Sequence, residues 1–83
     1  MTLLYFAWVR QKIGKSEEML VPPAADVAGL IAHLKGLGPN YADAFADLSR
    51  IRVAVNQRHA GLDAEIGPHD EVAFFPPVTG GSR

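Results

Sequence analysis

The chain has 83 residues, of which 48% are hydrophobic and 20% charged, and its formal net charge is −1. A chain of this length forms one small domain, which buries only about 60% of the surface that its unfolded form exposes. The balance of 8 basic and 9 acidic residues argues against nucleic acid as the main partner, because phosphate binding favours a clear basic excess. The chain contains no cysteine, which excludes disulfides, thiolate metal sites and a thiol nucleophile of its own.

The first ten residues, MTLLYFAWVR, contain neither a basic leader nor a small-residue cleavage site, so we expect a strand and not a signal peptide. Aromatic and branched residues predict this strand over Leu3 to Val9, apolar on both faces. Gly14 lies in a predicted turn, and residues 17–21 predict a second strand that forms a hairpin with the first. No apolar run approaches the roughly 20 residues that span a bilayer, so we expect a cytoplasmic protein without membrane contact.

One main helix is predicted in the middle of the chain, at about residues 26–36. Asp26 suits the N-cap position, and apolar residues follow at i, i+3, i+4 and i+7. Glycines and a proline after residue 35 form a helix stop signal. Residues 41–49 then predict a short helical turn in which Tyr41, Phe45 and Leu48 face the core.

Alternating patterns predict the remaining strands, over residues 51–56 and 71–75, with a tight turn and one further short strand around Gly61. The first and last strands are the most apolar segments, so we expect them to lie side by side as a central parallel pair. The order β-β-α-β-(β)-β indicates the α+β class and a ubiquitin-like β-grasp fold. This fold has a mixed sheet of four to five strands packed on one main helix, with a flexible C-terminal tail.

We expect the β-grasp domain to span residues 1–75 and the tail residues 76–83. The tail consists of Pro76, Pro77, Val78, Thr79, Gly80, Gly81, Ser82 and Arg83. The proline pair extends the chain away from the last strand. The side chains of the next two residues can contact a partner, and the glycine pair fits a narrow channel. A carboxylate on such a tail can be delivered into another protein's active site and activated there as an acyl-adenylate. By composition alone, the same residues are also compatible with a flexible terminus.

The tail and two internal segments resemble a known family. The run DEVAFFPPVTGG (residues 70–81) resembles the C-terminus of the small subunits of molybdopterin synthase, the sulfur carriers called MoaD. YFAWVRQKIG (residues 5–14) resembles the first strand of that family and the turn after it, and VAVNQ (residues 53–57) resembles its mid-chain strand. The resemblance covers nearly the whole chain, and its C-terminal segment is the most specific part.

The resemblance implies that Gly81 is the terminal residue of the active form. A ubiquitin-activating-type adenylyltransferase would use ATP to adenylate its carboxylate, and a persulfide on another protein would then supply sulfur to give a C-terminal thiocarboxylate. The tail would insert into the large synthase subunit and donate sulfur to cyclic pyranopterin monophosphate in molybdenum cofactor biosynthesis. Ser82 and Arg83 depart from the family pattern. Either a protease removes them or they do not belong to the natural chain, and a carrier that keeps them is inactive.

The resemblance further implies a heterotetramer of two small and two large subunits, with the active site on the large subunit and no cofactor bound by this chain. Phe6, Arg10 and Phe75 are the candidate partner-binding residues; Phe6 and Phe75 are alternatively core residues, and Arg10 a solvated surface charge. Trp8 is compatible both with an interface position and with a core position. An apolar residue is common in the family where His59 stands, which weakens the case for His59 in docking.

The three histidines have no metal-ligand spacing, and the sequence contains neither a nucleophile–base–acid set nor a glycine-rich phosphate loop. We therefore predict no metal site and no catalysis by side chains. Two other functions remain open. One is a sulfur carrier for thiazole or another thiolation pathway, and the other is a ubiquitin-like binding module without acyl chemistry.

Overall fold

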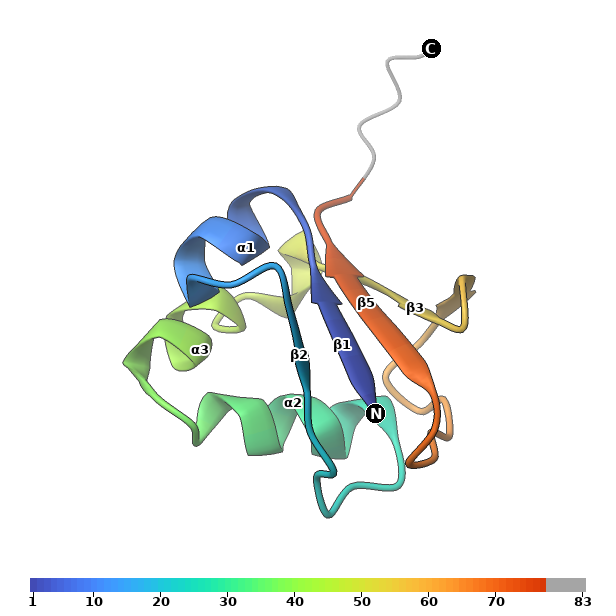
Figure 1. Ribbon diagram of the computed structural model, residues 1–83. Helices are drawn as coiled ribbons and strands as arrows, with labels where there is room; N and C mark the ends of the chain where they lie inside the picture. Colours follow the sequence, from blue (N-terminus) through green and yellow to red (C-terminus); the bar gives the residue numbers. More distant parts are fainter. Residues whose placement is uncertain (78–83) are drawn as a thin grey trace, which may run out of the picture.

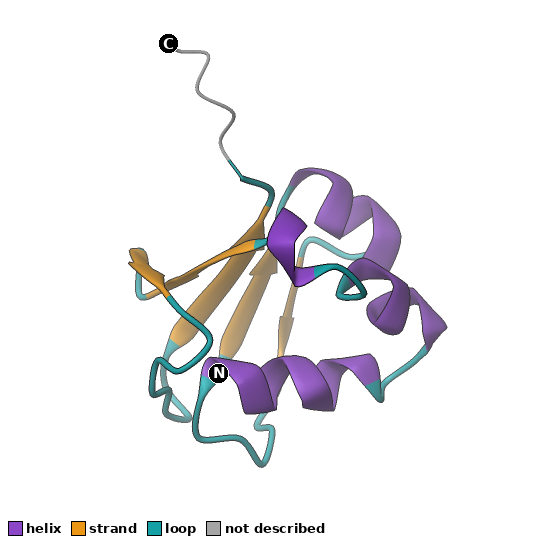
Figure 2. Ribbon diagram, turned by 180° about the vertical axis from the view of Figure 1, so that it is seen from behind, coloured by secondary structure: helices purple, strands orange, loops and turns teal. Residues whose placement is uncertain are grey.

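The computed structural model describes residues 1–77, which form a mixed sheet and a layer of helices (Figures 1 and 2). In chain order the elements are β1 (Thr2–Tyr5), α1 (Ala7–Ile13), β2 (Glu17–Met19), α2 (Val27–Lys35), α3 (Pro39–Ala44), a 3₁₀ turn η1 (Leu48–Arg50), β3 (Arg52–Val55), β4 (Arg58–Ala60) and β5 (Glu71–Phe75).

The five strands follow the order β2-β1-β5-β3-β4 across the sheet. β1 and β5 run parallel at its centre, with Leu3 opposite Val72 and Tyr5 opposite Phe74. β2 pairs antiparallel with β1, and β3 pairs antiparallel with β5. This arrangement confirms the predicted β-grasp fold and its central parallel pair.

All three helices cover the same face of the sheet (Figure 2), and the core lies between the two layers. The strand residues that face the helices are fully or almost fully buried, because successive side chains of a strand point to opposite faces. Phe74 lies at the centre of this core. Its ring centroid is 6.0 Å from that of Tyr5 and 5.0 Å from that of Phe45, which meets it edge-on.

The predicted main helix is confirmed as α2. Asp26 caps its N-terminus, since the side-chain carboxylate accepts a hydrogen bond from the Gly29 N–H over 2.7 Å. Gly36 follows its last residue. The predicted apolar stripe is buried, and it consists of Val27, Leu30, Ile31 and Leu34.

The prediction of a strand from Leu3 to Val9 is wrong in its second half. β1 ends at Tyr5, and the chain then forms helix α1, although the run of aromatic and branched residues favours a strand. Val9 and Ile13 are the buried residues of α1, at helical i, i+4 spacing. Gly14 ends the helix in the left-handed region, with φ of 94°, and is therefore a helix C-cap and not the turn of a hairpin.

Three smaller expectations are also refined. β2 is antiparallel to β1 as predicted but is shorter and is connected through α1. The expected helical turn is α3, and Leu48 lies just beyond it in η1, packed on the edge of the core. The alternation in residues 51–56 also predicts that Val55 faces inward, and Val55 is half-buried, packed against the core.

Candidate functional site: the tail root and its surroundings

The tail leaves the domain from the central strand of the sheet. β5 ends at Phe75, and Pro76 and Pro77 follow it, both half-buried (Figure 1). Hydrogen bonds hold this end of β5 on two sides, because the Phe6 N–H donates to the Phe74 carbonyl over 3.1 Å and β3 pairs with β5 as far as Phe75. We call Phe75, Pro76 and Pro77 the tail root, and these hydrogen bonds fix the position from which it starts.

The predictions for Val78, Thr79, Gly80, Gly81, Ser82 and Arg83 fall outside the described residues. They remain predictions.

The sheet has a second face that no helix of residues 1–77 covers, and we call it the open face. One row of side chains crosses it from strand to strand and consists of Glu17, Leu4, Ala73, Ala54 and His59, which are paired in register. Phe75 lies next to this row on the same face, with the His59 ring packed edge-on against it at 5.6 Å between centroids. Leu4, Ala73, Ala54 and Phe75 are only half-buried. The open face is thus an apolar surface beside the tail root.

Two of the three predicted partner-binding residues lie in or close to the tail root. Phe6 joins β1 to α1 and is 48% exposed, and Phe75 is the last residue of β5. The sequence predicts Arg10 at the end of the first strand; it lies instead on α1, where it is exposed beside Gly14 and Lys15. The exposure of Phe6 and the half-burial of Phe75 agree with a surface role for both residues.

A pocket of about 280 Å³ lies on the helical side of the tail root, between α1, α3 and η1. Trp8 forms one wall, and the Arg50 guanidinium lies over its ring, 5.1 Å from the centroid. Lys12 and Asp43 form an ion pair of 2.8 Å at the rim. We call this feature the Trp8 pocket. Sequence reasoning missed it because its two main residues are far apart in the chain and neither belongs to a motif.

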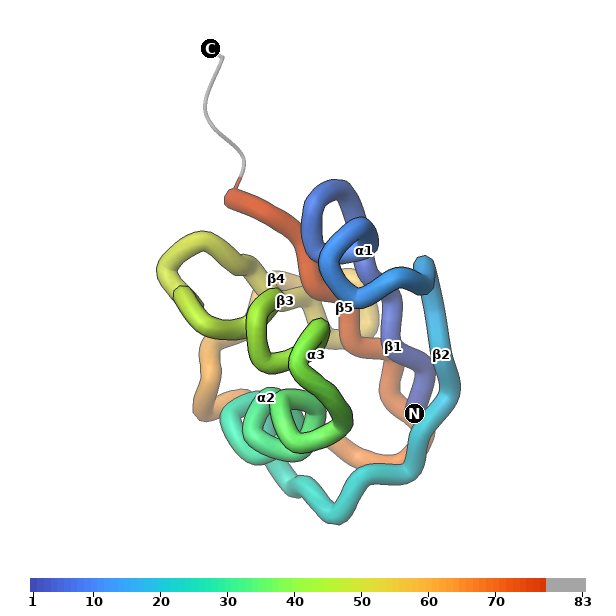
Figure 3. Tube along the Cα trace, turned by 90° about the vertical axis from the view of Figure 1, so that its left-hand side faces the viewer, coloured from blue at the N-terminus to red at the C-terminus, as the bar shows by residue number. Residues whose placement is uncertain are grey.

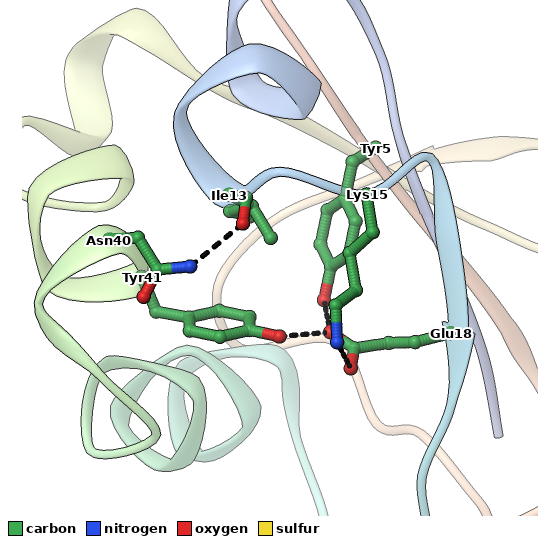
Figure 4. A network of polar contacts seen from close by, with 6 residues as sticks. All are labelled: Tyr5, Ile13, Lys15, Glu18, Asn40 and Tyr41. Atoms are coloured by element: carbon green, nitrogen blue, oxygen red, sulfur yellow. Dashed lines mark hydrogen bonds and ion pairs between the residues drawn. The ribbon is translucent and has the colours of Figure 1, made fainter.

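A polar network joins the edge strand to the helical layer (Figure 4). The Glu18 carboxylate accepts hydrogen bonds from the Tyr5 hydroxyl at 2.7 Å and the Tyr41 hydroxyl at 2.8 Å, and it forms an ion pair with Lys15 at 3.3 Å. Burial of Glu18 acts to raise its pKa, but the hydrogen bonds from the two tyrosines and Lys15 outweigh burial and hold the pKa below 4.5.

The same network raises the pKa of both tyrosines, first through burial and then through the hydrogen bond each makes with Glu18. Their hydroxyls therefore stay protonated and act as donors. Because the groups of the cluster are engaged with one another, its geometry is that of a structural clamp.

Within residues 1–77, no group of three or more His, Cys, Asp or Glu side chains is placed to hold a metal ion. None of the helices in this part of the chain is long and apolar enough to cross a membrane.

Comparisons with known proteins agree with this geometry. The model of the ThiS family matches residues 3–81. The molybdopterin synthase sulfur carrier subunit of Escherichia coli is 37% identical over 95% of this chain and 96% of its own length. The corresponding subunit of Mycobacterium tuberculosis is 38% identical over 95% of this chain and 94% of its own.

Solved structures give the same fold. SAMP1 from Haloferax volcanii matches with a TM-score of 0.75 and 30% identity, covering 98% of each chain. A protein from Pyrococcus furiosus described as a putative molybdopterin converting factor, subunit 1, matches with a TM-score of 0.72 and 32% identity, covering 93% of this chain and 95% of its own. By fold and by similarity over nearly its whole length, the chain belongs to the ThiS family and, within it, to the molybdopterin synthase sulfur carrier subunits.

Proposed function

We propose that this protein is the sulfur carrier subunit of a molybdopterin synthase and that Gly81 is its reactive terminus. One observation carries the proposal: the similarity to curated carrier subunits extends over 95% of the chain, and the family match runs to Gly81 itself. The described start of the tail supports it, because Pro76 and Pro77 continue from the central strand β5, which the neighbouring strands β1 and β3 hold in place.

The chemistry takes place at the chain end. The Gly81 carboxylate attacks the α-phosphate of ATP on an adenylyltransferase, and pyrophosphate leaves. A protein persulfide then attacks the acyl-adenylate, AMP leaves, and an acyl disulfide forms. A second thiol then attacks the donor protein's sulfur in that acyl disulfide, so a disulfide forms between the second thiol and the donor and the thiocarboxylate leaves. In the synthase, the thiocarboxylate sulfur is transferred to cyclic pyranopterin monophosphate, and water restores the carboxylate. The carrier supplies positioning, and ATP is bound by its partner.

The partners dock around the tail root. Phe6 and Phe75 provide apolar contacts, and Arg10 provides a cation for an acidic group of the partner. Because the large synthase subunit and the adenylyltransferase both take the tail, they use overlapping surfaces and bind in turn. The assembled synthase contains two small and two large subunits and works in the cytoplasm.

The test measures intact mass. A variant that ends at Gly81 is incubated with the adenylyltransferase, ATP and a persulfide donor, beside the chain that keeps Ser82 and Arg83. We expect a mass increase equal to one sulfur-for-oxygen exchange only in the variant that ends at Gly81. Sulfur transfer to cyclic pyranopterin monophosphate with the purified large subunit then identifies the pathway. An unchanged mass in both chains would contradict the carrier chemistry.

A second candidate function has a specific observation in its favour. The family model that matches is that of ThiS, and a solved structure with 28% identity is described as a small archaeal modifier protein. The same activated terminus would serve a different acceptor, such as a thiazole precursor or an amine. A thiocarboxylate that forms normally but does not convert the pterin would favour this candidate.

A further inference from the structure

The Trp8 pocket carries a cation on its wall. The Arg50 guanidinium lies over the indole of Trp8, so the ring restricts one face of the guanidinium and leaves its N–H edge available. Within residues 1–77, the structure gives the Arg50 guanidinium neither a hydrogen bond nor an ion pair. Stacking on the indole restricts the exposed Arg50 side chain in part, so less of its side-chain entropy is lost when a carboxylate binds it.

The other charges of the pocket are already engaged. Lys12 is paired with Asp43. The Asp47 carboxylate accepts hydrogen bonds from the Ser49 hydroxyl at 2.6 Å and the Ser49 N–H at 3.1 Å, which together lower its pKa, with a smaller contribution from the charge of Arg50. The two carboxylates that line the pocket, those of Asp43 and Asp47, repel a dianionic phosphate more strongly than a singly charged carboxylate. The pocket therefore suits a singly charged carboxylate, and the indole and Ala44 and Ala46 suit an apolar group beside it.

The pocket is continuous with the tail root. Trp8 lies two residues after Phe6, and the Phe6 N–H donates a hydrogen bond to the Phe74 carbonyl in β5. Arg50 precedes Arg52 by two residues, and Arg52 is paired with Phe75. Figure 3 shows α1 beside the point where the tail begins, with α3 between α1 and α2. The tail thus emerges between the open face on one side and the Trp8 pocket on the other.

We propose that the Trp8 pocket is a second docking site for the large synthase subunit, which inserts an acidic side chain flanked by an apolar one. The carboxylate would pair with Arg50, and the apolar group would lie against Trp8. Contacts on both sides of the tail root fix the direction in which the tail enters the partner, which contacts on the open face alone do not. The inference rests on the proposed function, because it assumes that the large subunit takes this tail.

The first experiment measures the dissociation constant for the purified large subunit at low and at physiological ionic strength. Arg50→Glu is compared with Lys35→Glu, a charge reversal at the end of α2, which lies at the opposite end of the domain from the tail root (Figure 1). We expect Arg50→Glu to raise the dissociation constant at least about tenfold, and more at low salt, while Lys35→Glu changes it less than about twofold. Thermal melting checks that both variants fold.

The second experiment uses the fact that the chain has one tryptophan. Labelling with 5-fluorotryptophan gives a single ¹⁹F resonance, at Trp8, which we expect to shift or broaden when the unlabelled large subunit is added. The same addition to an Arg50→Glu chain, at saturating partner, should give a smaller shift.

Equal binding by wild type and Arg50→Glu, or an unperturbed ¹⁹F resonance in the saturated complex, would overturn the inference and leave the carrier function intact. An effect of Arg50→Glu confined to the adenylyltransferase would overturn it as well. Failure of the wild-type chain to bind the large subunit would overturn both proposals.

Discussion

The Tyr41 hydroxyl in α3 donates a hydrogen bond to the Glu18 carboxylate in β2 over 2.8 Å. This contact joins the helical layer to β2 (Figure 4), which among the strands of residues 1–77 is paired with β1 alone. The Tyr5 hydroxyl reaches the same carboxylate from the central strand β1. One carboxylate thus connects three elements, and its loss is expected to loosen the edge of the sheet.

We expect Glu18→Gln to destabilise the protein by about 1–2 kcal/mol at neutral pH, because the charge-assisted hydrogen bonds from two tyrosines are weakened. The side chain of Glu18 is 12% exposed, so solvent screens these bonds little. Glu17→Gln is the matched control, since Glu17 is the exposed neighbour on the same strand and should change stability by less than about 0.5 kcal/mol. Urea denaturation measures both. Equal stability of the two variants would contradict the role of the clamp.

The Glu18 contribution should depend on pH. Its pKa in the folded protein lies below the ordinary value of 4.5, so the stabilisation is fully present above that value and is lost as the pH falls through the folded pKa. The stability difference between wild type and Glu18→Gln should therefore close as the pH is lowered from about 5 to about 2. Urea denaturation of both proteins over this range tests the prediction. A difference that stays constant would rule out titration of Glu18 as the cause.

Gly14→Ala should destabilise the protein by about 1–2 kcal/mol, because φ at this position is 94° and a side chain is strained there even though space is open. Gly36 is the matched control, since it also ends a helix but has φ of −81°. Gly36→Ala should be neutral or stabilising by up to about 1 kcal/mol. Thermal unfolding of the two variants compares the helix ends directly. A similar loss in both would contradict the distinction.

Asp26→Ala should cost about 1 kcal/mol, because it removes the acceptor that satisfies the Gly29 N–H at the start of α2. Asp26→Asn should retain most of the stability, since the amide oxygen can accept the same bond. Asp63→Ala, at an exposed loop position, should change stability by less than about 0.5 kcal/mol. Denaturant midpoints measure all three. If Asp26→Ala and Asp63→Ala behave alike, the cap contributes nothing.

Phe74→Ala and Phe6→Ala should differ in their effects, the first acting mainly on stability and the second mainly on binding of the large subunit. Phe74 is 0% exposed in the centre of the core, so Phe74→Ala should destabilise the protein by about 3–5 kcal/mol. Phe6 is 48% exposed, so Phe6→Ala should cost less than about 1 kcal/mol of stability but raise the dissociation constant for the large subunit at least about tenfold. Scanning calorimetry measures the stability of each variant, and titration calorimetry measures its dissociation constant for the large subunit. Unchanged binding by Phe6→Ala would remove Phe6 from the interface.

Several features follow from the sequence alone because their signals are local. The capped apolar stripe of α2 and the alternation that buries Val72 and Phe74 in β5 are set by residues close together in the chain. The C-terminal run DEVAFFPPVTGG likewise indicates the family by itself, since its twelve residues are contiguous. Short-range patterns of this kind determine an element wherever one periodicity dominates.

The tertiary structure decided the rest. The apolar residues at positions 3–9 fit both the two-residue period of a strand and the 3.6-residue period of a helix. The second half of this run forms α1 because Val9 and Ile13 pack in the core. The contacts between Glu18 and Tyr41 and between Trp8 and Arg50 join residues that are distant in the chain, so no local pattern predicts them. Whether Phe6 is core or surface depends on which face the helices cover. Long-range packing settles these points, because it alone determines which side chains meet and which remain exposed.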